Sequence, residues 1–147
     1  MKIISHRGYI NGPDATIENN PAHIKKIIET GIDAEIDVWY INNRFFLGHD
    51  EPRYEVSDNF LLDSRLWCHA KNISSLVNLL KIGAHCFWHQ EDDYTLTSKG
   101  FIWAYPGVQT PKSNSVFLFP ERYPKIEIKD FMFVCTDYIY KIGEKNE

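Results

Sequence analysis

Histidines and carboxylates in the first third of the chain have the types and spacing of a phosphodiester cleavage site. His6 and His49 are imidazoles that can move protons near neutral pH. Glu35 and Asp37 are two carboxylates that could hold a hard cation, and Arg7 is a guanidinium that could bind a phosphate. These residue types predict metal-dependent chemistry on a phosphodiester.

Glu35 and Asp37 lie two residues apart in segment 34–41, whose apolar residues indicate a β-strand. Both carboxylates therefore share one face of the strand, and Ile36 and Val38 take the other. The segment has the composition of a strand buried on both faces, where two uncompensated carboxylates are costly. A solvated acidic strand face is the alternative, and the apolar neighbours favour a bound cation.

The wider pattern is one of short strands with few helices. Two segments, 19–30 and 74–82, have apolar stripes at helical spacing and connect consecutive strands, as βαβ units require. Asn42 and Asn43 alone separate two strands, which predicts a tight reversal. Eight segments have strand composition: 2–5, 34–41, 44–48, 66–70, 85–89, 101–105, 115–119 and 131–136.

The chain length of 147 residues corresponds to one domain, which we place at residues 1–142, with 143–147 as a frayed carboxyl terminus. Eight strands leave about 18 residues per unit, compared with about 31 in a (β/α)₈ barrel of about 250 residues. A barrel would therefore have most of its outer helices shortened or missing. The alternative is an open α/β sheet in which some of the eight segments are turns.

Composition excludes several classes of protein. Hydrophobic residues at 44% and charged residues at 24% exclude a disordered or fibrous chain. The net charge of −4, with no basic run longer than Lys25-Lys26, argues against nucleic-acid binding. No signal-peptide core precedes Ser5-His6-Arg7 and no apolar run reaches about 18 residues, so we expect a cytoplasmic protein without a membrane span.

The cysteines are odd in number, and no pair has the spacing of metal ligands. Each lies within an apolar run, which predicts three buried, reduced thiols and no disulfide framework. They are Cys68, Cys86 and Cys135.

Several short motifs follow one another in a set order along the chain. They are His6-Arg7-Gly8, Glu18-Asn19, Gly31-x-Asp33-x-Glu35-x-Asp37-Val38 and His49-Asp50, with a weaker match at Cys135-Thr136-Asp137-Tyr138. This order resembles the glycerophosphodiester phosphodiesterase family, whose superfamily includes phosphatidylinositol-specific phospholipase C. The resemblance covers about a third of the chain well and implies a compact (β/α)₈ TIM-type barrel with shortened or missing outer helices.

The resemblance also implies roles for individual residues. His6 and His49 would act as the acid–base pair, and Glu35 and Asp37 would bind Mg²⁺ or Ca²⁺. The implied activity is metal-dependent hydrolysis of glycerophosphodiesters or related diesters. Two other outcomes stay open: a barrel that binds a phosphodiester or anionic headgroup without turnover, and a lyase that releases a cyclic phosphate.

Strand 66–70 carries the main departure from the family pattern. The family has a third carboxylate ligand two residues before a phosphate-facing lysine; here His69 stands in place of the acid, and Lys71 matches the lysine. Either His69 binds the metal, which would favour Mn²⁺ or Zn²⁺, or water and a substrate oxygen fill the position. Lys71 and Arg7 would share the negative charge of the phosphate in the transition state.

Other polar residues have plainer interpretations. Glu18 and Asn19 precede a helix, where such side chains commonly satisfy backbone donors. His89 is interpreted as a structural or rim histidine. Missing outer helices would expose apolar strand faces, so we expect a homo-oligomer as the assembly. The expected ligand is a small-molecule phosphodiester, as the resemblance implies.

Overall fold

A computed structural model describes residues 1–144 of the chain. Within this range, the helices are α1 (Pro21–Glu29), α2 (Asp58–Leu61), α3 (Ile73–Ile82), α4 (Ile139–Glu144) and a 3₁₀ turn, η1 (Pro120–Arg122). The strands are β1 (Lys2–His6), β2 (Asp33–Ile41), β3 (Arg44–Leu47), β4 (Tyr54–Val56), β5 (Leu66–Ala70), β6 (Cys86–Phe87), β7 (Tyr94–Leu96), β8 (Ile102–Ala104), β9 (Ser115–Leu118) and β10 (Phe133–Thr136).

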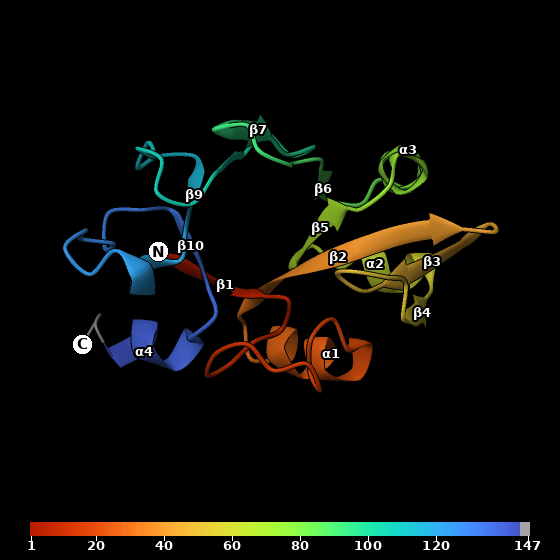
Figure 1. Cartoon of the computed structure of the whole chain (residues 1–147), viewed down its shortest axis with the longest axis horizontal. Coiled ribbons are helices and arrows are strands. Elements are labelled where there is room, and N and C mark those ends of the chain that lie inside the picture. Colours follow the sequence, from red (N-terminus) through yellow and green to blue (C-terminus); the bar gives the residue numbers. More distant parts are fainter. Residues whose placement is uncertain (145–147) are drawn as a thin grey trace.

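These strands form one mixed, open sheet (Figure 1). Parallel neighbours follow the order β6, β5, β2, β1, β10, β9, β8. Antiparallel strands extend it at two places: β3 and β4 branch from β2, and β7 pairs with β8. The amino-terminal strand therefore lies near the centre of the sheet.

The expected (β/α)₈ barrel is wrong, because the sheet does not close. No strand pairing joins β6 to β8 within residues 1–144; only bonds between Cys86 and Ser98 bridge from β6 to the loop before β8. The chain between β6 and β8 forms β7, which pairs antiparallel with β8. This stretch therefore contains neither an outer helix nor an eighth parallel strand. Segment 44–48, counted as a barrel strand, is instead the hairpin partner of β2.

The predicted strands and helices are all present, with ends shifted by a few residues. Asn42 and Asn43 close the predicted reversal with φ angles of 50° and 62°, as a tight hairpin requires. The elements that we did not predict are short: β4, β7, α2 and α4. Helix α4 includes residues 143 and 144 of the expected frayed end, and residues 145–147 lie outside the described part of the chain.

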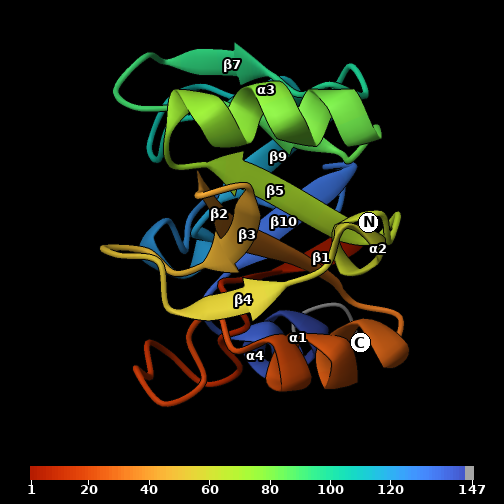
Figure 2. The ribbon, with the colours of Figure 1, turned by 90° about the vertical axis from the view of Figure 1, so that its right-hand side faces the viewer.

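Side-chain caps fix the two predicted helices beside the sheet. The Asn20 side chain accepts backbone N–H bonds at the start of α1, and Asn72 forms a capping box with Ser75 at the start of α3. Helix α3 packs on β2, β5 and β6, and α1 packs on β2. Figure 2 shows α3 along the outside of β5, with α1 and α4 at the opposite margin of the molecule.

Alternation along β2 and β5 separates two apolar layers. Even positions of β2 pack beneath α1 and α3. On the other face, Trp67 of β5 and Phe87 of β6 join an aromatic cluster with Trp103 and Phe133. Position 35 pairs in register with Trp67, so odd positions of β2 face this second layer. The carboxylates at 35 and 37 therefore stand at the margin of an aromatic core.

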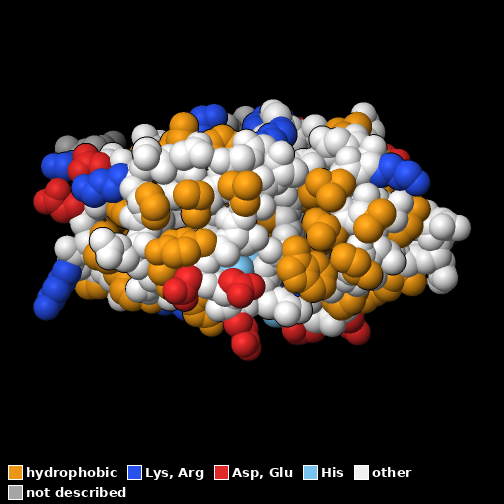
Figure 3. Space-filling view, turned by 90° about the horizontal axis from the view of Figure 1, so that it is seen from above, with side chains coloured by type: hydrophobic (Ala, Val, Ile, Leu, Met, Phe, Trp, Pro, Cys, Tyr) orange, Lys and Arg blue, Asp and Glu red, His pale blue; other side chains and the backbone are white. Residues whose placement is uncertain are grey.

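Apolar side chains also lie exposed on the face that carries α3 and β7 (Figure 3). Ile73, Val77 and Leu80 form a stripe along α3, and Tyr94 and Leu96 project from β7. Exposed apolar side chains of this kind are common at the contacts between subunits. Self-association through them stays a prediction.

The cysteines and the helices bear on two further expectations. Cys68, Cys86 and Cys135 are buried free thiols, as predicted. None of the helices within residues 1–144 has the length and apolar character needed to cross a lipid bilayer.

His85 provides a prediction about stability. Burial, with a smaller effect from Lys99, lowers the pKa of His85 from 6.5 to about 4 in the folded protein. As pH falls, His85 is therefore protonated in the unfolded chain before it is protonated in the folded protein. The free energy of unfolding should fall as pH drops from about 6.5 to about 4. Urea denaturation at several pH values should show a flatter profile for His85→Gln than for the wild type. Parallel profiles would contradict this assignment.

Candidate metal and phosphate site

The strand register brings four predicted site residues to one face of the sheet. Parallel pairing places His6 beside Glu35 across β1 and β2, and Asp37 beside His69 across β2 and β5. Residues in register point to the same face, and positions 35 and 37 share a face by alternation. The four side chains therefore gather at the carboxyl ends of β1 and β5 and on the part of β2 that lies between them, near the edge where open α/β sheets place their ligands.

Glu35, Asp37 and His69 form a candidate metal centre. Each offers a ligand atom, and the three atoms lie within 4.8 Å of one another. His69 Nδ1 is 3.7 Å from Glu35 Oε1 and 3.5 Å from Asp37 Oδ1. Asp37 Oδ1 is buried and has no hydrogen-bond partner among the described residues. An orphaned carboxylate oxygen beside a second carboxylate and an imidazole is a donor set that suits a divalent cation.

The orientation of His69 also suits metal binding. Its Nε2 lies 2.8 Å from the carbonyl oxygen of His89, to which it donates a hydrogen bond. The imidazole stacks on Phe87, with ring centres 5.0 Å apart and planes inclined by 10°. These contacts direct Nδ1 toward the two carboxylates, and a carbonyl partner on the second ring nitrogen is typical of metal-binding histidines.

Electrostatic coupling between these groups shifts their pKa values strongly. Burial raises the pKa of Asp37, but the proximity of His69 and Arg7 and a bond from Asn19 lower it to about 2. Burial lowers the pKa of His69, but Asp37 and Glu35 raise it to about 9. At neutral pH without a metal, protonated His69 therefore balances part of the buried negative charge, and a cation would take over from that proton.

Arg7 is fixed by carboxylates on two sides. Its Nε lies 3.3 Å from Asp37 Oδ2, and its Nη1 donates to Glu18 Oε1 at 3.2 Å. Tyr9 Oη donates to the same Glu18 oxygen at 2.7 Å. Glu18 thus positions Arg7. We had interpreted Glu18 as a carboxylate that satisfies backbone donors of the following helix, and this contact differs from that interpretation. Arg7 has a φ of 53°, a conformation that non-glycine residues adopt mainly where the surroundings impose it.

Asn19 is the second residue whose role the sequence did not reveal. Its Nδ2 donates to Asp37 Oδ2, and its Oδ1 accepts from the Asp37 backbone N–H, both at 2.9 Å. The helix cap is instead the next residue, Asn20. Asn19 therefore fixes both the backbone and the carboxylate of Asp37. The motif Glu18-Asn19, which contributes to the family resemblance, could have indicated such a role.

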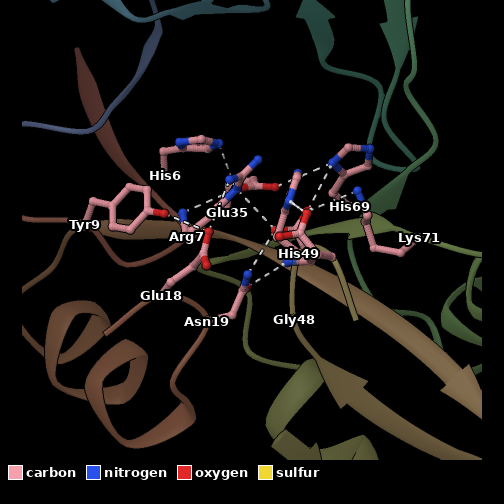
Figure 4. Close-up of polar contacts among 12 residues, drawn as sticks. His6, Arg7, Tyr9, Glu18, Asn19, Glu35, Gly48, His49, His69 and Lys71 are labelled. Atoms are coloured by element: carbon pink, nitrogen blue, oxygen red, sulfur yellow. Dashed lines mark hydrogen bonds and ion pairs between the residues drawn. The ribbon is translucent and has the colours of Figure 1, made fainter. Parts of the chain in front are cut away.

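The loop that carries His49 reaches the same edge of β2 as the Arg7 loop. The Arg7 N–H donates to the Glu35 carbonyl, and the Gly48 N–H donates to the Asp37 carbonyl. Carbonyls two residues apart point to the same edge of a strand, so the two loops meet there. Figure 4 shows Glu35 between His6 and His69, with Gly48 and His49 next to this group.

His49 itself is less enclosed than His6. Its side chain is 33% exposed, and its Nδ1 contacts Asp50 Oδ1 at 2.7 Å. Lys71 approaches Asp37 from the next strand, with Nζ 4.0 Å from Oδ1. The predicted phosphate contacts, Arg7 and Lys71, therefore approach the same carboxylate from opposite sides.

His6 has a partner that we did not predict, Asp137. His6 Nδ1 lies 2.6 Å from Asp137 Oδ1, and its Nε2 lies 3.8 Å from Glu35 Oε2. Asp137 directly follows β10, which pairs in parallel with β1. The signal was present in the weak motif at 135–138, but only the pairing of the first and last strands makes it meaningful. A carboxylate on Nδ1 fixes the imidazole with Nε2 free to exchange protons.

A cavity of about 420 Å³ opens over this group. Its polar side includes His6, Arg7, Glu35, His69 and Asp137. Aromatic side chains form much of the remaining wall: Tyr9, Trp103, Tyr105 and Phe119. His89 lies at this cavity, as the rim interpretation anticipated, whereas Asp37, His49 and Lys71 are not among its lining residues. The volume suits a small-molecule ligand.

No protein-family profile, curated protein or solved structure matches this chain. The resemblance to glycerophosphodiester phosphodiesterases therefore stays a prediction, based on the motifs and on the residues gathered here.

The candidate metal centre can be tested by thermal unfolding. Addition of Mn²⁺ should raise the melting temperature of the wild type, because an ion that binds only the folded state stabilises it by about 2.7 kcal/mol at a hundredfold excess over its Kd. Glu35→Gln should abolish most of this shift. The control is Glu55→Gln, which changes a surface carboxylate that is 56% exposed. Equal metal-induced shifts in both variants would exclude Glu35 as a ligand.

Gly48 tests how the His49 loop is placed. A Cβ at this position would lie 1.9 Å from the Glu51 carbonyl oxygen, so Gly48→Ala must displace the loop. At Gly100, with a φ of +83°, a Cβ meets nothing within 4 Å, and Gly100→Ala should cost only about 1–2 kcal/mol for the left-handed conformation. We expect a clearly larger loss of unfolding free energy for Gly48→Ala in urea titrations. Similar losses would mean that the loop relaxes easily.

Proposed function

We propose that this chain is a divalent-metal-dependent phosphodiesterase that acts on small, alcohol-bearing phosphodiesters such as glycerophosphodiesters. One observation carries the proposal: two of the three residues of a candidate metal centre, Glu35 and His69, line the same cavity as a carboxylate-oriented histidine, His6. Metal ligands alone would fit a structural site, and a histidine–carboxylate pair alone would fit many sites. Their combination beside Arg7 supports phosphodiester chemistry.

Three residues would hold the cation: Glu35, Asp37 and His69. When bound, the cation would polarise a phosphate oxygen and offset the charge that develops in the transition state. The nitrogen ligand favours Mn²⁺ or Zn²⁺ over Mg²⁺ or Ca²⁺. The short distances from His69 to both carboxylates support its inclusion in the ligand set, and the cation would displace the proton that these carboxylates stabilise on the imidazole.

The remaining residues would position the diester and move protons. Arg7 lines the cavity and offers a guanidinium held by Asp37 and Glu18, which suits a non-bridging phosphate oxygen. His6 would take a proton from the attacking hydroxyl or give one to the leaving alkoxide through Nε2, while Asp137 stabilises the imidazolium through Nδ1. His49 would supply the opposite proton transfer.

The exposed position of His49 favours one alternative function. Because His49 does not line the cavity, this chain could bind an anionic diester without turning it over. The two functions separate in a single assay: a catalyst gives metal-dependent product from an activated diester, whereas a binder gives only a ligand-dependent melting shift. Phosphorus NMR of the product formed from a glycerophosphodiester, which carries a neighbouring hydroxyl, then distinguishes a hydrolysed phosphate from the cyclic phosphate of a lyase.

The histidine assignment predicts graded losses of turnover. With Mn²⁺ and an unactivated diester, the ethylene glycol ester of glycerol phosphate, His6→Ala should lower kcat by about 10²- to 10⁴-fold, because a general acid or base is lost. Asp137→Asn should cost about 10- to 100-fold, because the imidazole keeps its place but loses its orienting charge. Glu55→Gln serves as the surface control. Full activity in His6→Ala would overturn the mechanism.

A further inference from the structure

Arg122 lies at the same cavity as His6 but takes no part in the chemistry described above. Its side chain is exposed, and its guanidinium carbon lies 4.1 Å from the centre of the Phe119 ring. No carboxylate within residues 1–144 forms an ion pair with it. Arg7, by contrast, is held by two carboxylates. Arg122 thus brings an uncompensated positive charge to the mouth of the cavity.

The segment before Arg122 is fixed firmly to the site. Glu121 Oε2 accepts from Thr136 Oγ1 at 2.8 Å, and its Oε1 accepts from the Asp137 N–H at 3.1 Å. These bonds attach η1 to the end of β10, at the residue that orients His6. The position of Arg122 is therefore tied to the position of the catalytic imidazole through one short, rigid path.

Phe119 completes this link and is itself strained. It has a φ of 54°, which is rare for a bulky aromatic residue, and such conformations persist where surrounding contacts impose them. Its ring meets the His6 ring edge-on at 4.9 Å and carries the Arg122 guanidinium on its face. The Phe119 ring thus lies between the His6 imidazole and the Arg122 guanidinium. A guanidinium over a ring keeps N–H groups that can form bidentate bonds with an anion.

We propose that Arg122 and Phe119 form a second anion subsite, which selects diesters whose alcohol on the His6 side carries an additional negative group, such as a carboxylate. This inference rests on the proposed function, since it assigns the substrate class of the same cavity. The scissile phosphate lies against Arg7, and the additional group of the alcohol lies against Arg122. Arg122 is a specificity residue in this scheme and exchanges no proton.

The test compares two synthetic diesters of glycerol phosphate that differ in one group: the second alcohol is glycolate in one and ethylene glycol in the other. With Mn²⁺, the wild type should favour the glycolate ester by about tenfold in kcat/KM, mainly through KM, as expected for one charge-assisted contact near solvent. Arg122→Gln should bring the ratio close to one. Added salt should lower the wild-type ratio, because the contact is partly screened.

The matched control is Arg53→Gln. Arg53 also lies over an aromatic ring, 5.3 Å from the centre of Tyr54, but does not line the cavity. Its loss should leave the ratio between the two esters unchanged. A ratio near one in the wild type, or an Arg122→Gln variant that keeps the wild-type preference, would overturn the subsite.

Failure of the proposed function gives a different result. If neither ester is converted with any divalent metal, the phosphodiesterase proposal fails, and titration calorimetry with the same two esters then tests the subsite alone. Tighter binding of the glycolate ester that Arg122→Gln abolishes would sustain it. Equal binding of both esters would overturn it.

Discussion

Two carboxylates on one face of a buried strand are the constraint on which the site depends. Glu35 and Asp37 are almost completely withdrawn from water, and such groups are tolerated only with compensating charge and hydrogen bonds. The chain supplies these from both flanking strands and from the loop before α1: Arg7, Asn19, His69 and Lys71. The need to balance the two buried negative charges of β2 therefore explains why basic and amide residues surround them. The same residues form much of the polar part of the site without a bound ligand.

Local patterns in the sequence were sufficient to predict the elements that carry this site. Alternation around Ile36 placed the carboxylates on one face, and the end of the first strand placed His6 near them. His69 was placed near them by the family pattern. The count of eight barrel strands was wrong for a reason that the sequence already contained, because the two-residue reversal at Asn42-Asn43 cannot lead to a parallel strand. Counting segment 44–48 among the barrel strands overrode that local signal.

The residues that sequence analysis missed are those whose roles depend on distant pairing. Asp137 acquires meaning only when β10 lies beside β1, and Asn19 only when its loop fits against the edge of β2 between two other loops. Neither contact has a periodicity or a spacing of its own. Phe119 is similar, because an aromatic residue in a left-handed conformation cannot be recognised from the chain without its neighbours.

The hairpin that follows Asp37 makes the site modular. Beyond the reach of β1, the same edge of β2 pairs with β3, and the other edge of β3 pairs with β4. Loop length or composition could therefore change around residue 49 during evolution while the parallel pairing of the central strands stays intact. His6 is embedded in the framework of the sheet, whereas His49 belongs to an appendage, and divergence within this protein's lineage would be expected to reshape the second histidine and its wall first.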